Sequence, residues 1–301
     1  MQLLLTGATG FVGSHLLKRL LAEGNSVRAL VRSPQKISLS PKPNLELVQG
    51  DVVEGAGLDE AMRGCHAVIH LVGIIVEAGS ATFERVHHLG TRNVVEAAKR
   101  SKIARFIQMS ALGARADGVS EYQTTKWKAE EVVRQSGIPW CILRPSLIFG
   151  PGDGFVNQML DVMRKAPLFR PVPGDGKPRF RPIFIDDVTG CFAQSLTNAA
   201  ATDLTIELGG ADELSLNEVL VEIAQCAGIR KPAVHVPMPA MMMGAAVAQT
   251  VLRRPPVTLG QLRMLKEGST CDIGPMKRIF GLTPIGFREG LRTYLSANSK
   301  K

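Results

Sequence analysis

The chain is poor in aromatic side chains, in paired cysteines and in long runs of one charge. Aromatic residues make up 5% of its 301 residues, and only two of them, Tyr122 and Tyr294, are tyrosines. The five cysteines are widely spaced without a C-x-x-C pair, and neither they nor the six histidines show metal-ligand spacing. This pattern excludes a disulfide-rich scaffold, gives no support for a metal site, and is typical of reduced, mostly buried thiols.

The formal net charge of +9 is spread along the sequence. No run of five or more Lys or Arg occurs, and neither zinc-finger spacing nor an aromatic RNA-binding motif accompanies the basic residues. We therefore expect no nucleic-acid partner. A solvated basic surface, together with a few arginines that serve an anionic cofactor, accounts for the charge.

A long uncharged stretch in the last third of the sequence is too interrupted to cross a membrane. No Asp, Glu, Lys or Arg occurs between Pro232 and Leu252, but prolines break its first half. Its uninterrupted apolar part, Ala240–Ala248, is shorter than the ~20 residues of a spanning helix. The N-terminus also lacks the features of a secretory leader. We expect a cytoplasmic protein, and contact of residues 238–254 with a membrane surface or a respiratory complex is the alternative.

Short apolar segments alternate with segments of helical periodicity along the first half of the chain. This alternation predicts a parallel sheet with helices on both faces, and near-continuous apolar strands fit burial on both sides. We therefore expect an α/β fold, a doubly wound parallel sheet of the Rossmann type. The expected strands are 3–5, 27–31, 45–48, 67–72, 105–109 and 140–143, and the expected helices are 11–22, 82–100 and 120–135.

A glycine-rich motif, T-G-A-T-G-F-V-G, follows the first expected strand and opens the first expected helix. Gly7 permits a tight turn, Gly10 lets the backbone approach a pyrophosphate, and Gly13 allows close packing of helix and strand. The helix N-terminus then presents free amides and a positive dipole to the phosphates. The residues predicted to bind a dinucleotide here are Gly7, Thr9, Gly10, Phe11, Val12 and Gly13.

Composition changes after Gly150, where prolines and glycines cluster and loops are expected to dominate. We predict an NAD(P)-binding domain over residues 1–150, with later segments near 182–210 returning to it. Residues 151–301 are expected to form a smaller, loop-rich part that binds a small-molecule substrate.

The end of the second expected strand predicts which dinucleotide binds. An acid there binds the ribose 2′-hydroxyl of NAD, whereas a base accommodates the 2′-phosphate of NADP. Here Arg32 stands without a nearby acid, and Arg28 and Lys36 add positive charge. The expected cofactor is NADP(H), with NAD(H) as the alternative. Asp51 and Val52, after the third expected strand, are placed to meet the adenine ring.

Tyr122 and Lys126 form a Y-x-x-x-K pair on an expected helix. Residues four apart lie one turn apart on the same helix face. Since a nearby ammonium stabilises a phenolate, Lys126 is expected to lower the pKa of Tyr122 towards a range useful for proton transfer. The same lysine is expected to hold the nicotinamide ribose.

Eight blocks resemble, in order, those of the extended and atypical short-chain dehydrogenases/reductases. They are T-G-A-T-G-F-V-G at 6–13, G-D-V at 50–52, V-I-H-L-V-G at 68–73, G-T-R-N-V-V-E-A-A at 90–98, M-S-A-L-G-A at 109–114, Y-Q-T-T-K at 122–126, L-R-P-S-L-I-F-G-P at 143–151 and F-I-D-D-V at 184–188. A further block, P-P-V-T-L-G-Q-L-R-M-L at 255–265, is similar to the subgroup of the accessory NAD(P)-binding subunit of respiratory complex I and its stand-alone bacterial relatives. The resemblance covers nearly the whole chain.

The resemblance implies roles for individual residues. Ser110 would orient a substrate carbonyl or hydroxyl, Tyr122 would be the acid/base, and Lys126 would support both the tyrosine and the ribose. His87 stands where many extended members carry an Asn, and it either completes a proton relay or is a satisfied helix histidine. The cofactor contacts expected along the sheet edge are Leu71, Val72, Gly73, Pro145 and Ser146.

Three functions remain open at this point. The first is an NADP(H)-dependent dehydrogenase or reductase that transfers hydride to or from a small or lipid-like carbonyl or hydroxyl substrate. The second is a sugar-nucleotide epimerase or dehydratase with a retained cofactor, against which the missing serine-rich V-Y-G-like turn argues. The third is a non-catalytic NADP(H)-binding module of a respiratory or membrane complex. The methionine cluster at 238–243 fits a core, an apolar lid or a partner contact.

Overall fold

The computed structural model describes residues 1–34, 42–252 and 255–295. The chain divides into two compact units, which are described separately. Unit 1 consists of Met1–Arg144, Val188–Ile206 and Arg278–Phe280. Unit 2 consists of Pro145–Asp187, Glu207–Lys277 and the chain from Gly281 on. The chain therefore returns to unit 1 twice.

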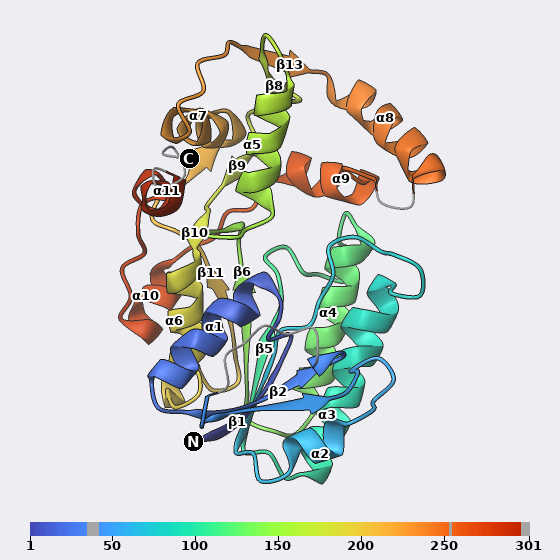
Figure 1. The fold of residues 1–301 in the computed structure, drawn as a ribbon, viewed down its shortest axis with the longest axis vertical. Helices are drawn as coiled ribbons and strands as arrows, with labels where there is room; N and C mark the ends of the chain where they lie inside the picture. The colour runs from blue at the N-terminus through green and yellow to red at the C-terminus, as the bar shows by residue number, and fades with distance from the viewer. Residues whose placement is uncertain (35–41, 253–254, 296–301) are drawn as a thin grey trace. The chain divides into compact units, whose positions relative to one another are not determined.

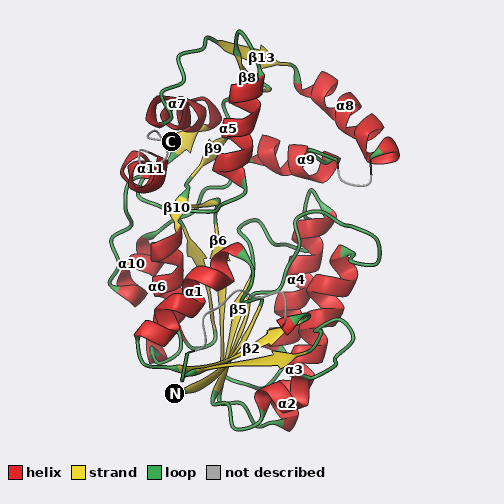
Figure 2. Cartoon of the chain, viewed as in Figure 1, coloured by secondary structure: helices red, strands yellow, loops and turns green. Residues whose placement is uncertain are grey.

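Unit 1 is built on a seven-stranded parallel sheet, whose strands are yellow in Figure 2. The strand order is β11-β6-β5-β4-β1-β2-β3. The order reverses beside β1, which pairs with β2 on one side and with β4 on the other. In open parallel sheets, ligands bind outside the carboxyl ends of the strands at such a reversal. The predicted doubly wound fold is confirmed. The strands are β1 Gln2–Thr6, β2 Ser26–Val31, β3 Leu45–Gln49, β4 Ala67–His70, β5 Arg105–Met109, β6 Trp140–Pro145 and β11 Leu204–Leu208.

Helices cover both faces of this sheet, with α1 and α6 on one side and α2, α3 and α4 on the other (Figure 1). Burial from both sides explains why the first strand is apolar throughout, since Leu3, Leu4 and Leu5 are all 0% exposed. The helices are α1 Phe11–Ala22, α2 Leu58–Met62, α3 Gly90–Arg100, α4 Glu121–Arg134 and α6 Ile185–Gln194, and a 3₁₀ turn spans Ala199–Ala201.

The helix expected over 82–100 consists of two segments of different geometry. A π-helix, η2, spans Glu84–Leu89, and α-helical geometry begins only at Gly90. A Cβ on Gly90 would lie 3.3 Å from Cγ2 of Val52, so a small residue suits the junction. Short π-helical segments are frequent at functional sites. This one contains His87, which is 1% exposed.

Unit 2 contains short strand pairs and the remaining helices. Its strands pair two by two, β7 with β10, β9 with β12, and β8 with β13. The strands are β7 Ile148–Phe149, β8 Arg170–Pro173, β9 Arg179–Phe180, β10 Ile183–Phe184, β12 Leu214–Ser215 and β13 Ala233–Val236. The helices are α5 Phe155–Lys165, α7 Leu216–Cys226, α8 Met238–Val251, α9 Leu259–Glu267, α10 Gly274–Phe280 and α11 Phe287–Leu295.

An aromatic cluster forms the core of unit 2. The ring of Phe149 lies 4.7 Å from that of Phe287 and 5.4 Å from that of Phe184, measured between centroids. Gly290 lets α11 approach this cluster, because a Cβ there would lie 2.7 Å from the Phe149 ring. Of the helices in the described residues, none combines the length and the apolar character needed to cross a bilayer.

Candidate functional site

The glycine-rich loop joins β1 to α1 and leaves the start of the helix open. Gly7 has a φ of +77°, and a Cβ on it would lie 3.1 Å from the backbone of Leu71 and Val72, just after β4. A Cβ on Gly13 would collide with the carbonyl oxygen of Gly7, so only glycine lets α1 pack against the loop. Gly10 caps the helix without a side-chain hydrogen bond, which leaves the first amides of α1 available to a phosphate.

A cleft of about 340 Å³ in unit 1 lies beside this loop. Its walls come from the residues that follow β1, β2, β3 and β4, the carboxyl ends of parallel strands. Phe11, Val12 and Gly13 do not line it and belong to the first turn of α1. The predicted cofactor residues that line the cleft are Gly7, Thr9, Gly10, Arg32, Asp51, Val52, Leu71, Val72 and Gly73.

Part of the cleft wall was not predicted from the sequence. Arg85 binds the carboxylate of Glu54 at 2.7 Å, and both residues line the cleft. No sequence motif predicts this part of the wall, because it is formed by the loop between β4 and η2 and not by a periodic pattern. The other lining residues from this loop and from η2 are Ile74, Ser80, Ala81 and Val86.

Of the three cations predicted on the phosphate side, Arg32 is the one that the structure places at the cleft. It follows β2 directly and is exposed. The prediction for Arg28 is wrong, because it binds Glu46 at 2.8 Å and donates to three carbonyl oxygens at the end of α2. Arg28 lies four positions before Arg32 along the strand, a distance of about 13 Å. Lys36 lies outside the described residues.

Asp51 is held in a tight turn at the edge of the cleft. Its Oδ1 accepts the amide of Val53 at 2.7 Å, and its backbone bridges to Ala56. The turn directs Asp51 and Val52 along the cleft wall. Contact of this carboxylate with an adenine amine remains a prediction.

Helix α4 presents Tyr122 and Lys126 one turn apart. Ser120 caps the helix through its hydroxyl, which accepts the amide of Gln123. The Lys126 ammonium is buried and donates to the carbonyl oxygen of Met109 at 2.7 Å. An atom added to the α-carbon of Gly73 would lie 3.6 Å from Nζ of Lys126. Since Gly73 lines the cleft, the lysine lies directly behind the cleft wall.

Burial shifts the pKa values of both groups in the direction of their neutral forms. The Tyr122 ring packs edge-on against Phe83 and His87, and burial raises the pKa of Tyr122 to about 12. The expectation that Lys126 lowers this pKa is therefore not met in the structure, since the ammonium is engaged with the carbonyl of Met109. Burial lowers the pKa of Lys126 to about 8, and the negative charge of Glu130 opposes that shift.

Glu130 anchors α4 through a buried ion-pair network. Its side chain is 0% exposed and accepts two hydrogen bonds from Arg144, at 2.8 and 2.6 Å. Arg134 binds the same carboxylate at 2.7 Å and also donates to the hydroxyl of Thr205. A buried carboxylate needs such partners, because an unpaired charge inside a protein is strongly destabilising.

Ser110 follows β5 and is 1% exposed. Its amide donates to the carbonyl oxygen of Leu143 at 2.8 Å. Its buried hydroxyl has no hydrogen-bond partner among the described residues. A buried hydroxyl without a partner is costly unless a ligand supplies one. Because Ser110 directly follows Met109, it lies next to the carbonyl group that binds Lys126.

His87 is neutral, and both of its ring nitrogens are hydrogen-bonded. Nδ1 of His87 lies 3.0 Å from the hydroxyl of Thr125. Nε2 lies 3.1 Å from the amide nitrogen and 3.0 Å from the carbonyl oxygen of Ile74. Burial lowers the pKa of His87 to about 3. This geometry favours the satisfied histidine over the proton relay.

His70, to which no role was assigned from the sequence, holds the end of β1 just before the glycine-rich loop. Its Nδ1 lies 2.6 Å from Oγ1 of Thr6, and its Nε2 lies 3.2 Å from Oγ1 of Thr91. The ring is 0% exposed, and burial lowers the pKa of His70 to about 3. It therefore ties the end of β1, just before Gly7, to α3. Its place in the V-I-H-L-V-G block was the one available signal.

The structure does not bring Pro145 and Ser146 to the cleft wall. Both belong to unit 2, where the Ser146 hydroxyl donates to the carbonyl oxygen of Ser269 at 2.9 Å. The Ser146 amide donates to the carbonyl oxygen of Leu208. Contact of these two residues with a nicotinamide remains a prediction.

Known proteins resemble the chain in sequence and in fold. The NAD(P)H-binding family matches residues 7–156. The ceramide reductase of Caulobacter vibrioides is 35% identical over 164 residues, 54% of this chain and 51% of that relative. The mitochondrial NADH dehydrogenase (ubiquinone) 1 alpha subcomplex subunit 9 of Arabidopsis thaliana is 29% identical over 220 residues, 71% of this chain and 54% of that relative. The chain thus spans about half the length of these curated relatives.

The structure of MoeE5 in complex with UDP-glucuronic acid and NAD has the same fold. It superposes with a TM-score of 0.77 at 24% identity and covers 100% of this chain and 99% of its own. The glycine-rich loop, the strand order and the cleft at the reversal point agree with these relationships. Through its NAD(P)-binding Rossmann domain, the chain belongs to the extended short-chain dehydrogenase/reductase superfamily.

Proposed function

We propose that the protein is an NADP(H)-dependent reductase that converts a carbonyl group of a lipid-like substrate into a hydroxyl. One observation carries this proposal. Three groups accompany a cleft suited to a dinucleotide: the buried hydroxyl of Ser110, which has no hydrogen-bond partner among the described residues, the phenol of Tyr122 and the buried ammonium of Lys126. Ser110 directly follows Met109, whose carbonyl oxygen accepts from Lys126, and Tyr122 lies one turn before Lys126 on α4. The ceramide reductase relative supports a lipid-like substrate.

The residues present fit a nicotinamide dinucleotide. Glycines that tolerate no Cβ shape the phosphate side, and the buried ammonium of Lys126 stands behind Gly73 for the ribose. Bound at this site, the nicotinamide supplies the hydride. The protein then has to position the carbonyl, to provide a proton and to stabilise the charge that the proton leaves behind.

Each of these tasks has a residue. Ser110 offers its hydroxyl to the substrate oxygen, because no group of the described protein occupies it. A pKa of about 12 keeps Tyr122 protonated at neutral pH, which is the state required to give a proton to a developing alkoxide. Lys126 is proposed to stabilise the phenolate that results once its ammonium leaves the carbonyl oxygen of Met109, which holds it in this structure.

Arg32 is proposed to select NADP(H), because it lines the cleft after β2 where an acid would select NAD(H). Arg32→Ala is expected to weaken NADPH binding about tenfold, the loss of one charge-assisted hydrogen bond, and to leave NADH binding unchanged. Fluorescence titration with both cofactors measures this. Arg92→Ala removes an exposed arginine of unit 1 that does not line the cleft, and should change neither affinity. If wild type and Arg32→Ala bind NADPH with equal affinity, Arg32 does not select NADP(H).

A sugar-nucleotide epimerase is the second candidate, because the MoeE5 structure, which has the same fold, holds UDP-glucuronic acid and NAD. The absence of a serine-rich V-Y-G-like stretch around Ser110 argues against it. A third possibility follows from the Arabidopsis relative, a non-catalytic binding module.

A substrate panel separates the three functions. The protein is incubated with NADPH and either long-chain ketones or UDP-hexoses, and cofactor oxidation and sugar isomers are measured. Ketone-dependent oxidation of NADPH is the expected result. Interconversion of UDP-hexoses without net cofactor oxidation would replace the proposal by the epimerase. Tight NADPH binding without turnover of either class would replace it by the binding module.

A further inference from the structure

Unit 2 contains a second cavity, of about 590 Å³, that the proposed catalysis does not use. Its volume lies in the range of small-molecule sites. The loop after β8, the end of β13, the start of α7, the start of α8 and the end of α9 surround it. Apolar side chains make up most of its wall, chiefly Pro173, Pro178, Pro237, Pro239, Met238 and Leu265.

The proline-rich wall offers few hydrogen bonds to an occupant. A proline has no backbone N–H, so four wall positions lack the donor that any other residue would supply. A sugar or a nucleobase that entered the cavity would lose its hydrogen bonds to water and find few replacements, which costs more than apolar contact returns. The wall therefore favours a hydrocarbon.

Two of the polar residues in the wall are already engaged. Nε2 of His235 lies 3.1 Å from Oδ1 of Asn217. Oδ1 of Asp175 accepts the amide of Lys177 at 3.0 Å. Both side chains therefore have hydrogen-bond partners within the protein, and the Asp175 carboxylate is an exposed charge beside the apolar wall.

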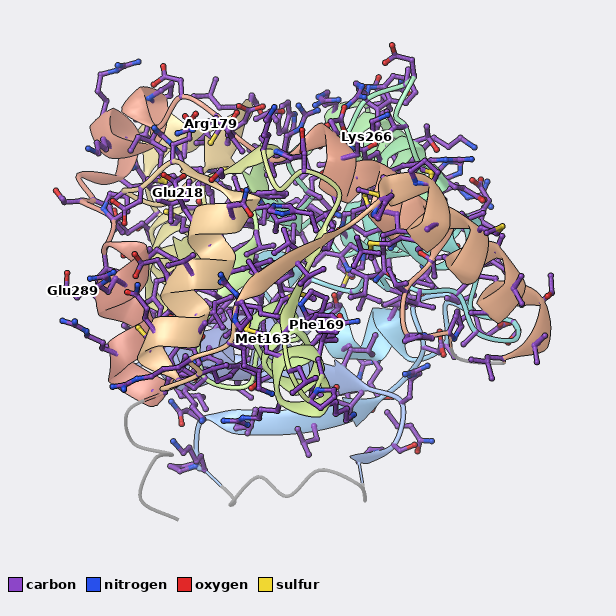
Figure 3. All side chains as sticks on the ribbon, turned by 90° about the horizontal axis from the view of Figure 1, so that it is seen from above. Met163, Phe169, Arg179, Glu218, Lys266 and Glu289 are labelled. Carbon is purple, nitrogen blue, oxygen red and sulfur yellow. The ribbon has the colours of Figure 1, made fainter. Side chains whose placement is uncertain are left out.

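The cavity wall contains one cation without an anionic partner among the described residues. Lys266, at the end of α9, lines the cavity and is exposed (Figure 3), and the described residues give it no ion pair. Asp175 also lines the cavity, but its carboxylate lies 3.8 Å from the exposed ammonium of Lys177. Lys266 is therefore the charge that remains for an anionic group at the mouth.

Met238 can adjust the depth of the cavity. Its methyl group lies 3.2 Å from the position of a Cβ on Gly174, where any larger residue would meet it. An unbranched thioether has several low-energy conformations and fits apolar ligands of different shape. The wall thus combines rigid prolines with one adaptable side chain.

We propose that this cavity binds a single-chain amphiphile, with an acyl or isoprenoid tail among the prolines and a carboxylate or phosphate head at Lys266. This proposal goes beyond the proposed reductase activity, and it is tested by ligand binding and not by turnover. The amphiphile site and the reductase activity can therefore be disproved independently of each other.

Binding is tested with laurate, farnesyl phosphate and dodecanol, each displacing a fluorescent fatty acid from the full chain in the presence of NADPH. Saturable one-to-one binding of laurate or farnesyl phosphate is expected, and the stronger of the two identifies the head group. Lys266→Glu should weaken both anions about fivefold and dodecanol less than twofold, since a single exposed charge contributes modestly. Arg263→Glu, on the same helix but away from the cavity, is the matched control.

Met238→Asp should weaken all three ligands at least tenfold, because it places a carboxylate inside the apolar wall. Met238 is the first residue of α8, where an acidic side chain is favourable for the helix, so this variant keeps its fold. Met243→Asp, on the exposed face of α8, controls for the change in helix composition and should bind like wild type. Wild-type binding by Met238→Asp, displacement of the probe by UDP-glucose, or the lack of saturable binding by wild type would each overturn the proposal.

Discussion

Tyr122→Phe is expected to lower kcat about a thousandfold while leaving NADPH affinity within a factor of two. Removing the hydroxyl removes the proton donor of the proposed reduction. The ring itself remains, edge-on against Phe83 and His87, so packing around the cleft is preserved. Turnover of a substrate from the ketone panel, NADPH titration and thermal unfolding are measured on the same preparation.

The chain supplies a matched control in its other tyrosine. Tyr294 lies in unit 2 and donates to Oδ2 of Asp153 at 3.1 Å. Tyr294→Phe loses one hydrogen bond and should keep the wild-type kcat. If Tyr122→Phe retains more than a tenth of the wild-type kcat, Tyr122 is not the proton donor and the proposed mechanism fails.

Lys126→Met is expected to make the protein more stable and less active. Burial lowers the pKa of Lys126 from 10.5 to about 8, a cost of roughly 3 kcal/mol for the charged form in the folded state. Methionine fills similar space without a charge but loses the hydrogen bond to Met109. We therefore expect the free energy of unfolding at pH 7 to rise by about 2 kcal/mol, with loss of turnover.

The pH dependence separates this effect from a simple packing change. Between pH 8 and 10.5 the unfolded chain keeps the Lys126 proton and the folded protein releases it, so wild-type stability from this group rises with pH. The advantage of Lys126→Met should therefore be full below pH 8 and disappear before pH 10.5, where the lost hydrogen bond to Met109 outweighs the remaining cost of the buried ammonium. Chemical denaturation across this range measures it. Lys128→Met, an exposed neighbour on α4, should show no such trend. If Lys126→Met is no more stable than wild type at pH 7, the buried ammonium of Lys126 does not destabilise the folded protein.

The central sheet could be predicted from the sequence because its strands are buried on both faces. Leu3, Leu4 and Leu5 form a continuous apolar run that only a doubly covered strand explains. The glycine-rich loop was equally predictable, since Gly7 needs a positive φ and Gly13 leaves no room for a Cβ. These requirements act on single residues and do not depend on distant parts of the chain.

Features that depend on three-dimensional contacts could not be predicted in this way. Arg28 and Arg32 have similar local sequence, yet Arg28 caps α2 while Arg32 reaches the cleft. The burial that raises the pKa of Tyr122 involves the rings of Phe83, just before η2, and of His87 in η2, both far from α4 in the sequence. The π-turn at 84–89 was hidden by helical periodicity that continues into α3.

The second unit was harder to predict for a local reason. Pro171 and Pro173 argue against a strand, yet Arg170–Pro173 forms β8. A proline is tolerated there because β8 pairs with β13 alone, so one of its edges needs no donor. The sequence also gives no sign that Lys231 caps α5. Its ammonium donates to the carbonyl oxygens of Met163 and Arg164 at the end of that helix, which lies far away in the sequence.

The interleaving of the two units sets the order in which a nascent chain can fold. When residue 144 leaves the ribosome, six strands of the sheet have been synthesised, but β11, which pairs with β6, has not. Residues 145–187 of unit 2 must be made before Leu204–Leu208 can complete that edge, and the last piece of unit 1, 278–280, follows much later. Domains usually fold one after the other during translation, whereas here unit 1 is not complete until residues 278–280 have been made, after most of unit 2.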